Sequence, residues 1–227
     1  MPTGWMMALL AGALAGAGVT LEDARNRQDR AALEQILSEC AARAEQRPND
    51  AAAQLRAAEA ASVLAEVAME LRDREAARSA AERGIRAAER AVALDRGVAE
   101  HHRLLGTLCG QIIPANLLLA VRYGKCASES VQRALELDPN SWKAWLSRGI
   151  GNYYLPPAFG GSLEAAIGDF RKALELSPRA ADAWLWLGIA LRKANRFGEA
   201  RQAILKSLEL NPNRVWARRQ LEKTPAQ

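Results

Sequence analysis

Apolar residues recur three or four positions apart in the last third of the chain, in two runs separated by a polar turn at 195–198. The positions of the two runs are Trp184, Leu187, Gly188 and Leu191, followed by Ala200, Ile204, Ser207 and Leu208. This spacing places side chains on one face of an α-helix, so it predicts two amphipathic helices. Pro212 ends the second helix because proline forces the preceding residue toward extended geometry.

The same pattern recurs upstream with a changing length. The residues that end successive units are Pro48, Arg96, Pro139, Pro178 and Pro212, which lie 48, 43, 39 and 34 residues apart. The sequence Ala-Leu-Glu-Leu precedes two of these ends, and Ser-Leu-Glu-Leu precedes the last. A small residue occupies one slot of every first helix, as Ala58, Gly106, Gly149 and Gly188. Each unit upstream of the last exceeds 34 residues by a number close to a multiple of one helical turn. We therefore expect the additional residues to lengthen the helices of the N-terminal units rather than their loops.

These positions resemble the tetratricopeptide repeat (TPR) family, whose 34-residue unit is a pair of antiparallel helices. In Ala181–Arg214 the tryptophan, the small residues and the proline stand at unit positions 4, 8, 20 and 32. The resemblance implies an all-α, TPR-like superhelical array with lengthened N-terminal hairpins. We expect an apolar segment at 1–20, a capping helix in 21–50, about four repeats in 51–214 and a capping helix with a tail in 215–227.

Composition agrees with a folded, all-helical chain. Hydrophobic residues make up 49% of the sequence and charged residues 25%, which is typical of globular proteins. The net charge of +5 is modest and dispersed. A nucleic-acid platform would need basic residues interleaved with exposed aromatic residues along one face, and the sequence lacks that pattern, so no nucleic-acid partner is expected.

The N-terminus is apolar, because residues 1–21 contain no charged side chain. The segment has the length of a signal-peptide core and is short for a membrane span. It lacks the basic residues that usually precede such a core. We expect export to the periplasm without a stable membrane span, and the alternatives are an uncleaved helix or a cytoplasmic protein.

Residues able to carry out chemistry are few. His101 and His102 are the two histidines of the chain, and adjacent residues point about a hundred degrees apart on a helix. His102 holds the slot filled by tryptophan in later units, which predicts a packed interior side chain. The three cysteines are too scattered for a disulfide framework or a zinc site, and Cys109 falls at a core position. We therefore expect no enzyme, cofactor or metal.

Binding in TPR proteins is usually on the concave face, which first helices line. The resemblance assigns unit positions 2, 5, 9, 12 and 13 to that face. The candidate partner-binding residues that follow from it are Arg103, Leu146, Ile150, Tyr153, Tyr154, Leu185, Ile189 and Arg192. TPR domains that bind acidic chaperone tails carry lysine at position 5 and asparagine at position 9. This chain has Arg103, Leu146 and Leu185 at position 5, which disfavours that partner and favours an apolar or helical segment.

Two helix-to-helix corners extend this hypothesis. The stretches 111–119 and 153–161 are both apolar, carry proline and occupy equivalent places in consecutive units. We expect them either to form one composite hydrophobic patch, with Tyr153, Tyr154 and Phe159 as anchors, or to pack on each other and stabilise the array. Trp186 lies off the main apolar stripe, which is consistent with an interface or with packing against the neighbouring repeat.

A narrower resemblance concerns the second corner and the helix after it. The aromatic-Leu-Pro run into Gly-Gly-Ser, followed by Ala165-Ala166-Ile167 and Phe170–Leu174, resembles the T-component proteins of TRAP-type solute transporters. That resemblance implies an exported accessory protein that oligomerises and binds an apolar small ligand or a substrate-binding protein. The two hypotheses are therefore a protein-binding scaffold and a transporter accessory, and a homo-oligomer is compatible with both.

Overall fold

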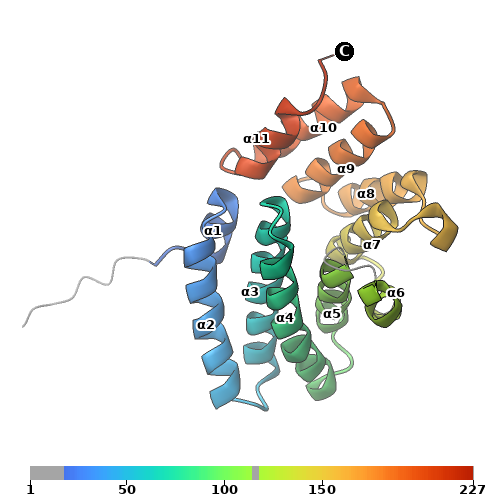
Figure 1. Ribbon diagram of the computed structural model, residues 1–227. Coiled ribbons are helices and arrows are strands. Elements are labelled where there is room, and N and C mark those ends of the chain that lie inside the picture. Colours follow the sequence, from blue (N-terminus) through green and yellow to red (C-terminus); the bar gives the residue numbers. More distant parts are fainter. Residues whose placement is uncertain (1–17, 114–117, 227) are drawn as a thin grey trace, which may run out of the picture.

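The computed structural model describes residues 18–113 and 118–226, and within them the chain forms helices joined by short turns (Figure 1). The all-α prediction is confirmed. The α-helices in chain order are α1 (Leu21–Arg27), α2 (Arg30–Gln46), α3 (Ala51–Glu70), α4 (Arg74–Leu94), α5 (Ala99–Ile112), α6 (Leu118–Leu137), α7 (Trp142–Tyr154), α8 (Leu163–Leu176), α9 (Ala181–Lys193), α10 (Phe197–Leu210) and α11 (Val215–Glu222). Consecutive helices from α3 to α10 pair as α3·α4, α5·α6, α7·α8 and α9·α10.

Short polar side chains fix where several helices begin. Asp50, Asp73, Ser141 and Ser162 each accept a hydrogen bond from the backbone N–H three residues later. Each such cap satisfies one of the N–H groups that a helix leaves unpaired at its start. Ser162 thus caps the helix that follows Gly160-Gly161.

Helix length falls along the array, but the three insertions are accommodated differently. In the first hairpin both helices are long, with 20 residues in α3 and 21 in α4. In the second, α5 has 14 residues and α6 has 20. In the third, α7 and α8 have 13 and 14 residues, so the insertion there lies in the corner, which holds the 3₁₀ turn Pro157–Phe159. The expectation of longer helices is wrong for that unit because Pro156 and Pro157 cannot continue a helix.

The N-terminal region also differs from the single capping helix expected over 21–50. It forms two helices, α1 and α2, separated at Gln28, whose backbone is left-handed with φ 57°. Asp29 then caps α2 by accepting from the N–H of Ala32. The short α1 is thus a separate element that the repeat pattern does not contain.

Glycine at the small slot lets the two helices of a repeat approach closely. A Cβ atom on Gly188 would lie 2.5 Å from Cγ1 of Ile204 and 2.9 Å from the carbonyl oxygen of Ala200. Gly149 is equally tight, since its Cβ would lie 2.5 Å from the ring of Phe170. The small residues Gly188 and Ala200 therefore lie where α9 and α10 approach each other closely.

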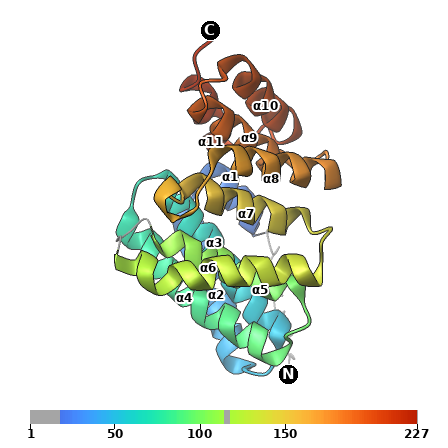
Figure 2. The same ribbon diagram turned by 90° about the vertical axis from the view of Figure 1, so that its right-hand side faces the viewer.

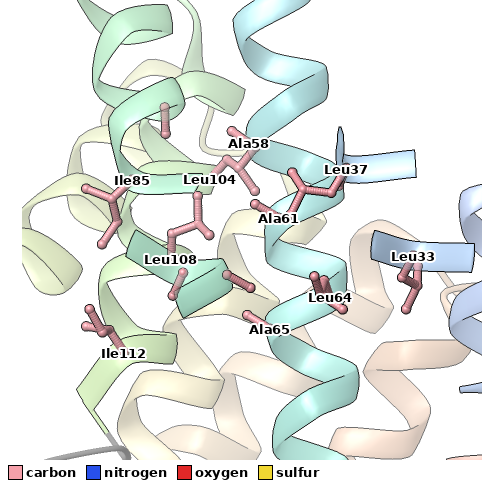
Figure 3. Close-up of a cluster of buried hydrophobic side chains, with 14 of the residues drawn as sticks. Leu33, Leu37, Ala58, Ala61, Leu64, Ala65, Ile85, Leu104, Leu108 and Ile112 are labelled. Atoms are coloured by element: carbon pink, nitrogen blue, oxygen red, sulfur yellow. The ribbon is translucent and has the colours of Figure 1, made fainter. Parts of the chain in front are cut away.

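Two large hydrophobic clusters hold the array together. The N-terminal cluster is built from α1 to α5 and relies on alanine, with Ala58, Ala61 and Ala65 of α3 facing Leu104 and Leu108 of α5 (Figure 3). The C-terminal cluster spans α8 to α11 with part of α7. A small cluster between α6 and α7 connects the two. Within the described residues, no hydrophobic cluster contains side chains from both α1–α3 and α9–α11.

The array curves until its ends meet. Figure 1 shows α11 beside α1 and above the α3–α4 hairpin, and Figure 2 shows the same elements from the side. Residue contacts join α1 to α11 directly. A helix long and apolar enough to cross a membrane is not found in the portion of the chain that the structure describes.

Position 4 of the repeat has a hydrogen-bonding role. Nε1 of Trp145 donates to the carbonyl of Pro139 at 2.8 Å, and Nε1 of Trp184 donates to that of Pro178 at 2.9 Å. Nε2 of His102 lies 3.0 Å from the carbonyl oxygen of Arg96, so it takes the same place. His102 is consequently only half-buried and His101 is the buried member of the pair, which corrects the expected interior position of His102.

Candidate functional site

An aromatic cluster lies where α7 ends and α9 packs against it. The ring of Trp186 is at its centre, with centroid distances of 5.7 Å to Tyr153, 6.0 Å to Tyr154, 6.3 Å to Phe170 and 5.4 Å to Trp216. Trp186 is only 9% exposed. Of the two explanations for this tryptophan, packing against neighbouring elements is confirmed. Trp186 lies beneath Tyr153 and Tyr154 and contacts both rings.

The exposed edge of this cluster is Tyr154 with Leu155. Their exposed fractions are 51% and 44%, which is unusual for large apolar side chains in this chain. The Tyr154 ring stacks edge-on against Tyr153 at 5.0 Å. Partial burial, helped by Tyr153 and by the charge of Glu70, raises the pKa of Tyr154 to about 12. The phenol therefore stays neutral, and α7 presents an uncharged aromatic ring with an aliphatic neighbour.

A cationic side chain lies beside the same edge. The ammonium nitrogen of Lys193 sits 4.2 Å from the centroid of the Tyr153 ring and donates to the Tyr153 carbonyl at 3.0 Å. Burial raises the pKa of Tyr153, so this phenol is also neutral. Lys193 therefore places a positive charge next to the exposed pair Tyr154 and Leu155.

Four other candidates on the concave face divide into two buried and two half-buried residues. Leu185 and Ile189 are 1% and 4% exposed. They belong to the C-terminal cluster, which also includes residues of α7 and α11. The expectation that they line an open groove is therefore wrong, because neighbouring helices of this chain cover them. Leu146 and Ile150 of α7 are half-buried and remain accessible.

The two candidate arginines are engaged within the chain. Arg103 donates twice to the carboxylate of Glu100, at 2.7 Å in each bond. Arg192 donates to the backbone and side-chain oxygens of Gln220, at 3.0 and 2.8 Å, and so ties α9 to α11. Both guanidinium groups thus have a structural partner, a role that their repeat positions alone do not reveal.

Part of the predicted composite patch lies outside the described residues. Residues 114–117 and the side chains of 118–121 are in this group, as is the side chain of Phe159. Within the second corner, Leu155, Pro156, Pro157 and Ala158 are exposed. The joining of the two corners into one patch stays a prediction.

A partly buried ion-pair network is the feature that sequence analysis missed. Arg25 of α1 forms ion pairs with Glu66 of α3 and Asp182 of α9, at 2.6 and 3.0 Å. Arg214, at the start of α11, pairs with Glu66 at 2.9 Å and with Glu70. The partners lie up to 157 residues apart in the sequence, so no local sequence pattern predicts these pairs.

The cysteines also differ from expectation. Cys109 of α5 and Cys126 of α6 form a disulfide bond although the scattered cysteines predicted no disulfide framework, and Cys109 is buried as its core position predicts. The bond joins the two helices of the second hairpin across 17 residues of sequence. Cys40 is free and half-buried, and burial raises the pKa of its thiol. A thiolate nucleophile at Cys40 is therefore disfavoured.

Two hollows on the surface of the described residues are open rather than enclosed. The larger, about 460 Å³, lies beside the disulfide and is lined by charged residues on one side, namely Glu82, Arg86, Glu89 and Arg122. The other, about 290 Å³, lies against α9 and α10 around Leu187 and Leu191. Neither resembles the enclosed apolar pocket that a small apolar ligand needs. In the described part of the chain, no three metal-ligating side chains gather around one point.

Comparison with known proteins agrees with this geometry. Residues 159–215 match the tetratricopeptide repeat family model. The thermophilic TPR protein TTC0263 of Thermus thermophilus superposes with a TM-score of 0.61 and 17% identity, over 85% of this chain and 90% of that chain. PilF of Pseudomonas aeruginosa gives a TM-score of 0.48 and 18% identity over 77% and 79% of the two chains. YrrB, a TPR protein with an unusual peptide-binding site, gives 0.44 and 20% over 91% and 100%.

No curated protein matches the chain by sequence. The comparisons give no support to the narrower resemblance to T-component proteins. The similarity to TTC0263 extends over most of both chains, and at its low identity it establishes the fold. The chain therefore has the tetratricopeptide fold, and its residues 159–215 match the family itself.

Proposed function

We propose that this chain is a protein-binding scaffold that takes an apolar or amphipathic helical segment of another protein at the exposed end of α7. The observation that carries the proposal is the pair Tyr154 and Leu155, both exposed on top of a packed aromatic cluster. Aromatic anchors on a rigid base lose little conformational freedom on binding, which is why tyrosine is enriched in protein interfaces.

The surroundings of this pair suit a macromolecular partner better than a small ligand. Ile150 and Leu146 lie one and two helical turns before Tyr154 along α7 and are half-buried, so they extend the apolar surface along the helix. Lys193 places a cation beside it, which favours an acidic residue next to the apolar residues of the partner. The hollow near the disulfide is mostly polar and the hollow on α10 is open to solvent, so neither encloses an apolar small molecule.

The test is a double substitution, Tyr154→Ala with Leu155→Ala, in the full chain. Proteins captured from the native host by the parent chain are compared with those captured by the double variant and by Leu205→Ala. Leu205 is the matched control because it is 49% exposed on α10, away from the aromatic cluster. A partner that depends on the proposed surface is lost only in the double variant.

The affinity of the purified pair then decides the proposal. Truncating a central aromatic anchor costs about 2 kcal/mol or more, so calorimetry of the double variant should show at least a roughly 30-fold weaker complex. The proposal is rejected when the double variant and Leu205→Ala bind every captured protein with the affinity of the parent chain.

Export from the cytoplasm is part of the same proposal. The uncharged residues 1–21 and the Cys109–Cys126 disulfide support it, since structural disulfides persist mainly in oxidising compartments. The test is N-terminal sequencing of the protein from its host, combined with alkylation under non-reducing conditions. A retained Met1 together with two alkylated cysteines at 109 and 126 would contradict export.

A further inference from the structure

The contact between the two ends of the array shares no hydrophobic cluster among the described residues, and polar side chains join it. The N-terminal hydrophobic cluster stops at α5 and its immediate neighbours, and the C-terminal cluster contains no residue of α1 to α3. What joins the ends is hydrogen bonds and ion pairs. Surfaces that bury little apolar area separate far more readily than a hydrophobic core, because few contacts resist their separation.

Arg25 is the centre of this contact. Its guanidinium donates to both oxygens of Glu66, at 2.9 and 2.6 Å, and to both oxygens of Asp182, at 3.0 Å each. Forked pairs of this kind are the most geometrically demanding ion pairs that proteins make. Burial disfavours the charge of Asp182, yet the neighbouring Arg25 holds the pKa of Asp182 below its usual value. One side chain of α1 therefore bridges the first and last repeats.

Arg214 supports the bridge from the other end of the chain. It is 1% exposed, and it donates to Glu66 at 2.9 Å, to Glu70 at 3.1 Å and to the backbone carbonyl of Arg25 at 3.1 Å. Asn211 adds a hydrogen bond to Asn26 at 3.1 Å. These bonds join the same two ends of the array as those of Arg25, so Arg214 contributes to the closure as well.

Helix α1, which carries Arg25, is short and is joined to α2 at Gln28. Helix α1 has seven residues, too few to be stable alone, and it joins α2 through the left-handed residue Gln28. Its apolar contribution to the N-terminal cluster is small, consisting of Ala24 and the partly buried Leu21. A rotation about Gln28 can therefore release α1 at little apolar cost.

We propose that α1 is a latch: the forked ion pairs of Arg25 hold the superhelix closed, and their release lets the first and last repeats separate as two bodies. Breaking the contact leaves the two hydrophobic clusters intact, so the open form keeps its helices.

The experiment measures the distance across the closure. Spin labels are placed at Ser38→Cys on α2 and Gln202→Cys on α10, both exposed, in a chain carrying Cys40→Ser. Pulsed electron resonance should give one narrow distance distribution for this chain. With Arg25→Ala added, the distribution should become longer and broader, while circular dichroism shows an unchanged helix content.

Two controls separate the latch from a general loss of structure. Arg27→Ala removes an exposed arginine from the same helix and should leave the distance unchanged. Methylguanidinium at millimolar concentration should shift the Arg25→Ala distribution back toward the closed distance, because it supplies the missing cation. An unchanged distance in folded Arg25→Ala overturns the proposal.

A second variant keeps the test decisive if Arg25→Ala fails to fold. Asp182→Asn retains the side-chain size and leaves Arg25 paired with Glu66, so it weakens the closure alone. The latch requires a folded, more open Asp182→Asn chain. Unfolding of both variants would overturn the proposal, because the contact would then be integral to the fold and not a separable closure. The binding surface would remain testable through Tyr154 and Leu155 in either case.

Discussion

The substitution Gly188→Ala sets two effects of opposite sign against each other. In the interior of a helix, alanine is favoured over glycine by about 1 kcal/mol, so helix propensity alone predicts a more stable α9. The new methyl group would lie 2.5 Å from Cγ1 of Ile204 and 2.9 Å from the carbonyl oxygen of Ala200. The latter is backbone, so relief requires α9 and α10 to move apart. Overpacking of this kind costs about 1–3 kcal/mol, and more where backbone must shift.

We therefore expect a net loss of about 1–2 kcal/mol, which corresponds to a melting temperature lower by roughly 2–8 °C in a chain of this size. Gly168→Ala is the matched control, since Gly168 lies within α8 and its Cβ would meet nothing within 4 Å. That substitution should raise the melting temperature by a few degrees. Thermal unfolding followed by circular dichroism measures both. The reasoning about close approach is refuted if Gly188→Ala is as stable as the parent chain or more so.

Two further predictions concern charge and the disulfide. Burial and the nearby Glu66 raise the pKa of Glu70 to about 7 from 4.5, so the folded chain binds more protons than the unfolded chain between these values and stability falls as the pH rises through 7. Lowering the pH from 8 to 6 should raise the free energy of unfolding by about 1 kcal/mol, or the melting temperature by roughly 2–4 °C. Glu70→Gln should abolish this dependence on pH. A melting temperature of the parent chain that falls on acidification would contradict the assignment to Glu70. Replacing Cys109 and Cys126 by serine opens a loop of 17 residues and should lower the free energy of unfolding by about 3 kcal/mol in urea titrations. A reductant should destabilise the parent chain similarly and leave the double variant unaffected, and equal stability of the two chains under oxidising conditions would contradict this.

The repeat architecture could be predicted because its determinants are local. Gly188 and Ala200 lie 12 residues apart, and the tryptophan slot is fixed by a hydrogen bond to a carbonyl six residues earlier, as in Trp184 to Pro178. Spacing of this kind is visible in a single sequence. The corner after Tyr154 departs from the expected lengthened helix, since two consecutive prolines override the pattern of increasing helix length.

The candidate surface could be predicted only in part, because exposure depends on distant elements. Tyr154 was identified from its repeat position and is exposed, whereas Leu185 occupies an equally suitable position and is buried among residues that include those of α11. Repeat register specifies which face a residue is on, but not what covers that face. Arg192 illustrates the same limit, since its partner Gln220 lies 28 residues later on the helix that caps the array.

The lengthened first hairpin has a structural explanation that the repeat pattern does not supply. Helix α3 has seven more residues than α9, which extends it by about 10 Å. Aligned on the small slot, α9 ends at the position equivalent to Val63, so Glu66 and Glu70 both stand in the added turns. Both acids bind Arg214, and Glu66 together with Asp182 binds Arg25. A hairpin of standard length would end before the last repeat and leave both arginines without these carboxylates. The extra length thus places acidic groups where the two ends of the array meet, and the closure follows from helix length as much as from charge.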